Sequence, residues 1–357
     1  AGIERARKNG VSEELLAEMQ ELTGCVAVLD TGRPGPTLAL RFDIDCIPVT
    51  ESTDDKHVPT HCGFASKNPG FMHACGHDAH MSMGLAVCHW LMDNKDKLSG
   101  KVKILFQPAE EGVRGAAGMA ASGILDDCDY FLSSHVAMLA KSGELATNLY
   151  GFLCTTKYDV TFNGRASHAG VSPQEGRNAL AAAANATVQM LGISRHGGGM
   201  TRINIGQLVA GEGRNVIPSK AVMKLEVRGE TMEINNYMSE QVTNIVEGIA
   251  KGFSVTYDMR KMGEAVDLTA DQELIDILNE SGREVGLKVL DKPLNFGGSE
   301  DATILARRVQ AHGGKAAFFV WGSDRPSGHH SALFDIQEKD MAPAFDLWTH
   351  VLPKILK

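Results

Sequence analysis

Four segments of the chain gather the kinds of side chain that bind metals in proteins. They are His73-Ala-Cys75-Gly-His77-Asp78-Ala-His80, Glu110-Glu111, His135 and His329-His330. Imidazole, thiolate and carboxylate together suit a transition metal such as Zn or Mn better than Ca or Mg. A single cysteine cannot build the Cys-rich tetrahedron of a structural zinc site. The donor types therefore indicate a catalytic metal that activates water.

Each segment alone has a plainer interpretation, because an isolated histidine is more often packed or solvated than bound to a metal. Glu110-Glu111 alone fits a solvated helix start, and Cys75 alone fits a small buried hydrophobic residue. Two adjacent glutamates also fit a division of labour, in which one binds metal and the other takes a proton from water. Spacing alone leaves open which glutamate does which.

Short apolar runs precede three of these segments and predict the strands that position them. The runs cover residues 37–43, 101–106, 129–134 and 315–321, and their character is typical of strands buried on both faces. Helical patterns lie between them, one of them from Met81 to Leu98. The carboxyl ends of parallel strands are where open α/β sheets bind ligands. We therefore expect the metal-binding side chains to meet at one sheet edge.

The middle of the chain follows a different pattern, whose predicted order β-α-β-β-α-β is that of a ferredoxin-like unit. The predicted strands and helices are 156–163, 178–194, 201–210, 219–228, 231–251 and 254–260. The apolar runs and helical patterns outside this unit predict an α/β fold with a mostly parallel sheet covered by helices. This catalytic domain is discontinuous, with residues 1–152 and 263–357, and residues 153–262 form an inserted ferredoxin-like α+β domain.

Composition excludes several other classes of protein. The chain has 357 residues, more than the roughly 250–300 at which single cores stop growing. Its 35 basic and 44 acidic residues give a net charge of −9, so nucleic acid is not an expected partner. Apolar runs fall well short of the roughly 20 residues of a membrane span, and seven scattered cysteines are typical of reduced thiols. We expect a cytoplasmic protein that does not bind membranes.

The sequence motifs resemble the amidohydrolase branch of the co-catalytic metallopeptidase superfamily. The motifs that carry the resemblance are HACGHDAH, FQPAEEG, SHV, GRASHAGVSPQEGRNAL, GRNVIPSKAVMKLEVRG, GGSEDAT and GHHSALFD. They span essentially the whole chain in the family's order. The branch contains indole-acetyl-amino-acid, hippurate and aminobenzoyl-glutamate hydrolases, and LDTGRPGPTLALRFDID and MHACGHD look most like the last group.

The resemblance implies two divalent metal ions per subunit, Mn or Zn. Cys75 matches a ligand that bridges both ions. His77 and His135 match the ligands that complete the first site, and Glu111 and His330 match those that complete the second. Glu110 matches the general base. Asp43 and Asp78 match acidic residues beside the site, which orient the ligands.

The resemblance also assigns roles within the inserted domain, which is expected to act as a lid and a dimerisation domain. His168 matches a histidine that reaches a neighbouring subunit's active site and stabilises the oxyanion. Asn215 and Arg228 match residues that hold the substrate's terminal carboxylate. Two features depart from the family. Ala332 stands where a proline is usual, and the longer N-terminal helical segment of family members is expected to be missing from this sequence.

The implied reaction is hydrolysis of the amide bond of a small N-acyl amino acid, with p-aminobenzoyl-glutamate as the expected substrate. A hippurate- or auxin-conjugate-type aminoacylase is an alternative within the same class. A metal-binding subunit with weak catalysis is an alternative from another class, and Glu110 disfavours it because a pure binder needs no base. We expect a homodimer through the inserted domain, and the sequence leaves open a mixed assembly with a related second subunit.

Overall fold

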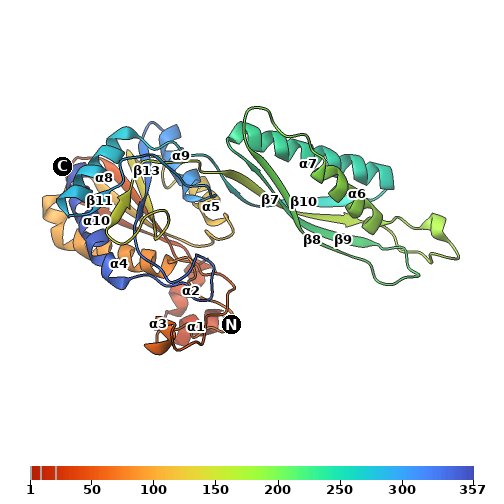
Figure 1. Cartoon of the computed structure of the whole chain (residues 1–357), viewed down its shortest axis with the longest axis horizontal. Helices are drawn as coiled ribbons and strands as arrows, with labels where there is room; N and C mark the ends of the chain where they lie inside the picture. Colours follow the sequence, from red (N-terminus) through yellow and green to blue (C-terminus); the bar gives the residue numbers. More distant parts are fainter. Residues whose placement is uncertain (1, 9, 21) are drawn as a thin grey trace.

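Two β-sheets organise the chain. The computed structural model describes residues 2–8, 10–20 and 22–357. Figure 1 shows the two sheets in separate lobes of an elongated molecule, with β7 starting near the larger lobe and running away from it. The chain enters the smaller lobe after the fifth strand of the larger sheet and returns to complete that sheet.

The larger sheet has seven strands and is mostly parallel. Its strands lie in the order β1 (Cys25–Asp30), β3 (Lys101–Gln107), β2 (Thr37–Asp43), β4 (Tyr130–Val136), β13 (Lys315–Trp321), β5 (Glu144–Ala146) and β11 (Lys288–Val289). β1 runs antiparallel to β3, and β5 antiparallel to β13. The other neighbouring pairs are parallel, which confirms the predicted α/β class.

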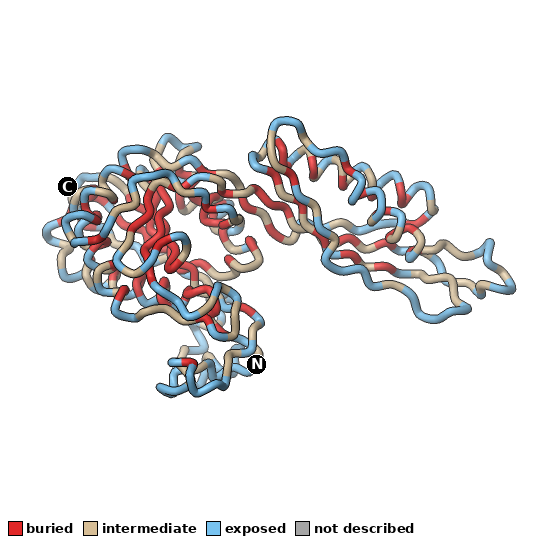
Figure 2. The backbone as a smooth tube through the Cα atoms, viewed as in Figure 1, coloured by how far each residue is buried: buried red, intermediate tan, exposed pale blue. Residues whose placement is uncertain are grey.

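Helices cover both faces of this sheet because its central strands are apolar on both sides. The helices on one face are α4 (His77–Asn94), α8 (Gln272–Glu284) and α10 (Met341–Ile355), and those on the other are α5 (Gly115–Ala121) and α9 (Ala302–Ala311). Successive strand residues point to opposite faces, so Leu40 packs in one core and Ala39 in the other. Figure 2 shows the buried backbone concentrated in these strands.

The smaller sheet is antiparallel and is covered on one face only. Its strands lie in the order β10 (Thr256–Ala265), β7 (Cys154–Asn163), β9 (Lys220–Gly229) and β8 (Thr201–Ala210). The covering helices are α6 (Ala179–Leu191) and α7 (Met232–Phe253). Along the chain the order is β7-α6-β8-β9-α7-β10, which confirms the predicted ferredoxin-like order. The second face of the sheet remains open.

Short elements complete the described chain. They are α1 (Gly2–Lys8), α2 (Glu13–Met19), α3 (Val58–His61), η1 (Lys95–Lys97), η2 (Pro173–Glu175), η3 (Glu338–Asp340) and a parallel pair of β6 (Leu149–Tyr150) with β12 (Leu294–Asn295). None of the helices in residues 2–8, 10–20 and 22–357 combines the length and the apolar character that a membrane crossing requires.

The helix that was predicted to start at Met81 begins four residues earlier, at His77. Gly76 caps it with a φ of 85°, a conformation that glycine adopts at no steric cost. A Cβ at Gly76 would lie 2.4 Å from Val136 Cγ1. The glycine therefore lets the segment turn into α4 directly against β4, and His77 becomes the first helical residue.

Candidate active site

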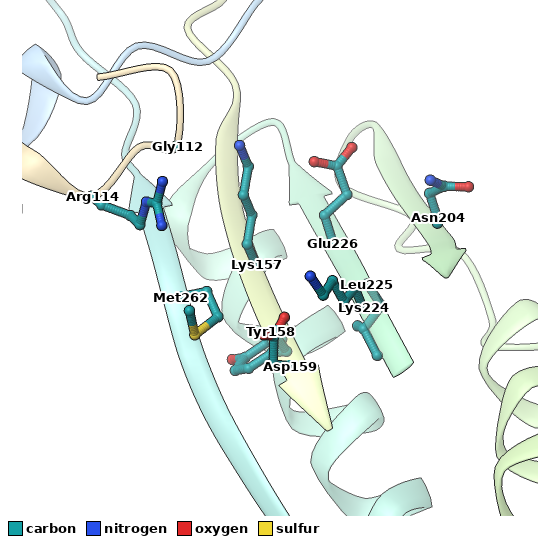
Figure 3. Close-up of a pocket in the computed structure, with 11 residues that line it drawn as sticks. Gly112, Arg114, Lys157, Tyr158, Asp159, Asn204, Lys224, Leu225, Glu226 and Met262 are labelled. Carbon is teal, nitrogen blue, oxygen red and sulfur yellow. The ribbon is translucent and has the colours of Figure 1, made fainter. Parts of the chain in front are cut away.

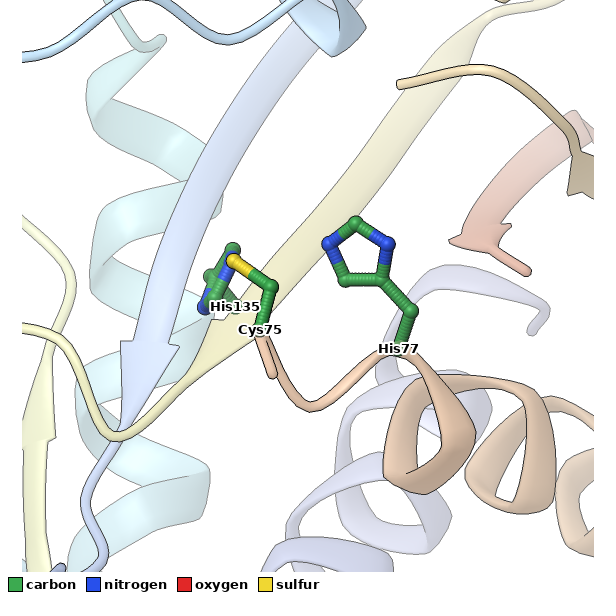
Figure 4. Close-up of side chains that lie close together, drawn as sticks. All are labelled: Cys75, His77 and His135. Carbon is green, nitrogen blue, oxygen red and sulfur yellow. The ribbon is translucent and has the colours of Figure 1, made fainter. Parts of the chain in front are cut away.

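The structure brings the five side chains predicted as metal ligands together beside the carboxyl ends of the parallel strands. Cys75, His77 and His135 each offer a donor atom within 4.8 Å of the others (Figure 4). Cys75, Glu111 and His330 form a second group under the same limit. Because the thiol of Cys75 belongs to both groups, the arrangement has the form of a site for two ions that share one ligand.

Hydrogen bonds orient the two buried imidazoles toward this cluster. His77 Nδ1 donates to the carbonyl oxygen of Asp45 at 3.0 Å, and in the described part of the chain its buried Nε2 has no hydrogen-bond partner. His135 Nδ1 donates to the carbonyl oxygen of Val136 at 2.8 Å, and its Nε2 lies 3.5 Å from Cys75 Sγ. A carbonyl acceptor fixes the proton on Nδ1, so the Nε2 lone pair of each ring faces the cluster.

The second group is held on strained backbone. His330 Nε2 lies 3.2 Å from Glu111 Oε2, and His330 has a φ of 65°. Ala109, Val113 and Ala137, which flank the other candidate ligands, have φ values of 60°, 50° and 57°. A non-glycine residue in this left-handed region costs about 1–3 kcal/mol and persists where the surroundings enforce it. Such strain is concentrated at functional sites, and here it surrounds the ligand cluster.

Two acidic residues that were predicted beside the site differ in their placement. Asp43 is fully buried and lies with its Oδ2 at 3.6 Å from His77 Nε2. His80 donates from Nδ1 to Asp43 Oδ1 at 2.5 Å and accepts the Val136 N–H on Nε2 at 2.9 Å, so both ring nitrogens of His80 are used. Asp78, by contrast, is exposed and lines a separate cavity. Within the described residues it belongs to no group of candidate ligands.

Asp45 fixes the turn that carries the two glutamates, a role that the sequence analysis did not assign. Its Oδ1 accepts the backbone N–H of Glu110 at 3.0 Å, and its Oδ2 accepts that of Glu111 at 3.1 Å. Burial opposes the charge, but hydrogen bonding to His77 lowers the pKa of the Asp45 carboxyl below its usual value. One carboxylate therefore positions both glutamates and, through its carbonyl, His77.

A buried cation beneath the cluster was also missed. Arg41 is fully buried in β2, with its guanidinium 2.7 Å from Asp43 and 3.1 Å from each of Glu300 and Asp301. Although burial opposes it, these three carboxylates raise the pKa of Arg41. A charged residue inside the apolar run of residues 37–43 was the signal that could have found it, because a buried charge requires partners.

Negative charge exceeds positive charge around the candidate ligands. Glu110 lies with its Oε2 at 4.0 Å from His77 Nε2, and burial, followed by Glu300 and Asp301, raises the pKa of its carboxyl well above the usual range. Burial and then the Glu111 charge likewise raise the pKa of the Cys75 thiol. Divalent cations would balance this donor set and deprotonate the thiol. The residues present therefore fit a metal site.

Four of the candidate ligands, Cys75, Glu111, His135 and His330, line a cavity of about 290 Å³ to which both sheets contribute. Its apolar wall comes from Val113, Met138 and Phe296. Thr155, Lys157 and Arg228 line the side that the smaller sheet provides. Arg228, predicted as a substrate-binding residue, is thus brought to the cavity of its own chain.

His168 and Asn215 lie away from this cavity. Both are exposed, and the Ala169 N–H donates to the Asn215 carbonyl oxygen at 2.9 Å, which joins their two loops. The His168 loop follows β7 at Asn163, whereas Thr155 near the other end of the strand lines the cavity. The strand between Thr155 and Asn163 spans roughly 27 Å. The chain therefore does not bring these two residues to its own ligand cluster.

A mostly parallel α/β sheet with two groups of candidate metal ligands that share a thiol, and with a buried carboxylate beside them, is typical of a metal-dependent hydrolase. The chain belongs to Peptidase family M20/M25/M40, which it matches over residues 39–354. This family includes dinuclear metal-binding peptidases. The match confirms the resemblance that the motifs indicated.

Relatives agree with the expected branch. The chain is 53% identical, over 99% of its length and 84% of the relative, to a Haemophilus influenzae homolog of p-aminobenzoyl-glutamate hydrolase. It is 44% identical, over 96% of its length and 80% of the relative, to indole-3-acetyl-aspartic acid hydrolase of Enterobacter agglomerans. The crystal structure of aminobenzoyl-glutamate utilization protein from Klebsiella pneumoniae has a TM-score of 0.80 and 37% identity, covering 98% of this chain and 79% of that one. The expected class, a hydrolase of amide bonds, is confirmed.

Proposed function

We propose that this chain is a binuclear metal amidohydrolase that cleaves p-aminobenzoyl-glutamate to p-aminobenzoate and glutamate. The observation that carries the proposal is the pair of ligand groups that share Cys75, with Glu110 buried beside them. Two divalent ions, Mn or Zn, would supply there a Lewis acid and a lowered pKa for the attacking water. The roles of the individual residues below are part of this proposal.

Glu110 acts as the general base. Its carboxylate faces the unpartnered Nε2 of His77 at 4.0 Å, so a water among the ligands is within reach of its proton-accepting oxygen. Glu110 takes the proton of the attacking water and later returns it to the departing amine nitrogen. Asp45 holds the backbone of Glu110 throughout.

The cavity wall suits an aromatic acyl group joined to an anionic amino acid. Val113, Met138 and Phe296 offer an apolar surface, and Arg228 offers a guanidinium for the terminal carboxylate. Two relatives are named as hydrolases of p-aminobenzoyl-glutamate and of indole-3-acetyl-aspartic acid, and both of these compounds join an aromatic acyl group to an anionic amino acid. A hippurate- or auxin-conjugate-type aminoacylase is the alternative, and kcat/KM for the three kinds of substrate distinguishes them.

We also propose that residues 153–262 form a lid and dimerisation domain, which pairs with a second copy of the chain. Exposed apolar side chains support this: Val188 and Leu191 on α6 are 71% and 53% exposed, and Val209 on the edge strand β8 is 58% exposed. Unpaired edge strands and apolar patches are surfaces that a partner covers. A related second subunit is the alternative occupant of this surface.

Seven free cysteines support a reducing, cytoplasmic setting.

In this dimer, each lid lends His168 and Asn215 to the active site of the partner chain. The distance of both residues from the cavity of their own chain supports this arrangement. His168 Nδ1 accepts the N–H groups of Gly170 and Val171 at 3.2 Å each. The ring proton therefore lies on Nε2, from which His168 can donate to an oxyanion while Asn215 contributes to holding the substrate carboxylate.

Complementation tests the shared site. A His168→Ala chain is mixed with a Glu110→Gln chain, each nearly inactive alone. Action in trans gives mixed dimers one intact site and one with both defects, so activity recovers toward roughly half per mixed dimer. Action in cis leaves every site damaged. Recovery that fails despite demonstrated subunit exchange would remove the shared-site proposal.

The function itself is tested by turnover. The chain is loaded with Mn or Zn, incubated with p-aminobenzoyl-glutamate, and the release of p-aminobenzoate is measured, with chelated chain as the control. Metal-dependent turnover by the chain alone supports the proposal. Metal binding without turnover, both alone and with a related second subunit present, would favour the metal-binding subunit with weak catalysis.

A further inference from the structure

We propose that Lys157 recognises the side-chain carboxylate of a dicarboxylic amino acid substrate. The inference rests on the proposed amidohydrolase function and assigns to its site a preference for glutamate or aspartate over their neutral amides. Lys157 lies on β7 and lines the active-site cavity together with Thr155 and Arg228. The sequence motifs did not single it out.

Strand pairing places Lys157 beside Arg228 on the open face of the smaller sheet. Thr155 pairs with Arg228, and Lys157 pairs with Glu226. Lys157 and Arg228 are therefore diagonal neighbours, roughly 7–8 Å apart at the backbone. Val160, which points to the other face, is packed in the core beneath the helices. Two cations at this spacing suit the two carboxylates of one short dicarboxylic amino acid, each carboxylate taking one charge-assisted hydrogen-bond donor.

The charges on this face leave Lys157 available for a ligand. Arg228 Nη2 lies 3.0 Å from Glu226 Oε1, so the Glu226 carboxylate forms an ion pair with the arginine. Across residues 2–8, 10–20 and 22–357, no carboxylate lies within 4.0 Å of the Lys157 ammonium. The carboxylate opposite Lys157 in the strand register is thus engaged elsewhere, and a bound dianion would supply the missing negative charge.

The direction of the side chain agrees with this role. In Figure 3, Lys157 extends along the sheet toward the loop that carries Gly112 and Arg114, just after the two glutamates of the site. Lys224 and Asp159 lie further along the strands in the same view. Lys224 contributes to the second cavity shown there, of about 330 Å³, and is not part of the active-site lining. Lys157 lines both cavities, whereas Arg114 belongs to the lining of the second one only.

The test compares p-aminobenzoyl-glutamate with p-aminobenzoyl-glutamine, which has the same shape and lacks the side-chain charge. For Lys157→Met, kcat/KM for the glutamate compound is expected to fall by about 10- to 100-fold, the value of a hydrogen bond to a charged group. Its kcat/KM for the glutamine compound is expected to change little. Lys157→Arg should retain the preference, because the positive charge is kept. Lys224→Met, on the same sheet, is the matched control and should leave the preference intact.

Several outcomes would overturn the inference. Equal kcat/KM for the two compounds in the unmodified chain would do so, and so would an equal loss for both compounds in Lys157→Met, as expected of a lysine that is merely solvated or structural. If the chain hydrolyses neither compound, the proposed function fails. In that case, the affinities of the glutamate and glutamine compounds for the metal-loaded chain, measured by calorimetry, still test the role of Lys157. A preference for glutamate that Lys157→Met removes supports the inference, and equal affinities refute it.

Discussion

Replacing Asp45 by Asn tests the hydrogen bonds that hold the two glutamates. The carboxylate accepts one backbone N–H on each oxygen, at 3.0 Å from Glu110 and 3.1 Å from Glu111. The amide of Asp45→Asn keeps one acceptor and turns an NH₂ group toward the other N–H. Because the Asp45 side chain is only 17% exposed, water can do little to replace the lost hydrogen bond. A hydrogen bond to a charged group contributes about 1.5–3 kcal/mol, which sets the scale of the local destabilisation.

This loss should appear in metal binding and turnover rather than in folding. Residues that orient metal ligands typically change metal affinity or activity by about 10- to 100-fold when they are substituted. We therefore expect Asp45→Asn to shift the midpoint of the activity–metal titration upward by about that factor. The fold should survive, since a loss of up to about 3 kcal/mol is smaller than the usual stability of about 5–15 kcal/mol.

The assay is turnover of p-aminobenzoyl-glutamate against Mn concentration, with the metal content of the purified chain measured in parallel. Asp78→Asn is the matched control, because Asp78 lies next to His77 in sequence and is exposed, away from the ligand groups. It should titrate like the unmodified chain. If Asp45→Asn retains both the metal midpoint and kcat, or if Asp78→Asn loses as much, the proposed role of Asp45 is wrong.

Three further predictions address the same site. Glu110→Gln should retain its metal and lose about 10²–10⁴-fold in kcat, the range for removal of a general base; near-full activity with both ions bound would show that Glu110 is not the base. Cys75 should resist alkylation until a chelator removes the metal, and equal labelling of loaded and chelated chain would remove it from the ligands. Gly76→Ala should lower the free energy of unfolding, measured in urea, by roughly 2–5 kcal/mol, because it combines a positive φ with a Cβ 2.4 Å from Val136 Cγ1. Gly70→Ala, with a φ of 83° and open space around it, should lose only the conformational part, about 1–2 kcal/mol, and an equal loss in both would refute the packing argument.

The parallel sheet could be predicted because its strands are buried on both faces. The run of residues 37–43 became β2 with those bounds, and the run of residues 315–321 became β13. β1, Cys25–Asp30, was not predicted, although its first five residues are all apolar. As an antiparallel edge strand it leaves these residues exposed or half-buried. β5 and β11 were missed because three and two residues carry too little pattern to read.

The ligand cluster could be expected from the sequence, whereas the residues that hold it could not. Strand ends of a parallel sheet meet at one edge whatever their spacing along the chain, so the sequence predicts that Glu111 and His135 lie close together. One partner of Arg41 could not be predicted, because Asp301 lies 260 residues further along the chain. Asp45 was visible at a strand end, but its bonds to the Glu110 turn depend on how two loops approach each other. Such contacts become apparent only in three dimensions.

The most direct test of the central claim is to locate the metals. Crystals of the Mn-loaded chain are measured at a wavelength at which Mn scatters anomalously, and the peaks are placed in the difference map. We predict two peaks per chain, one on each side of Cys75 Sγ, the first also contacting His77 and His135 and the second also contacting Glu111 and His330. A single peak, or two peaks of which either lies away from Cys75, would contradict a binuclear site that shares this thiolate.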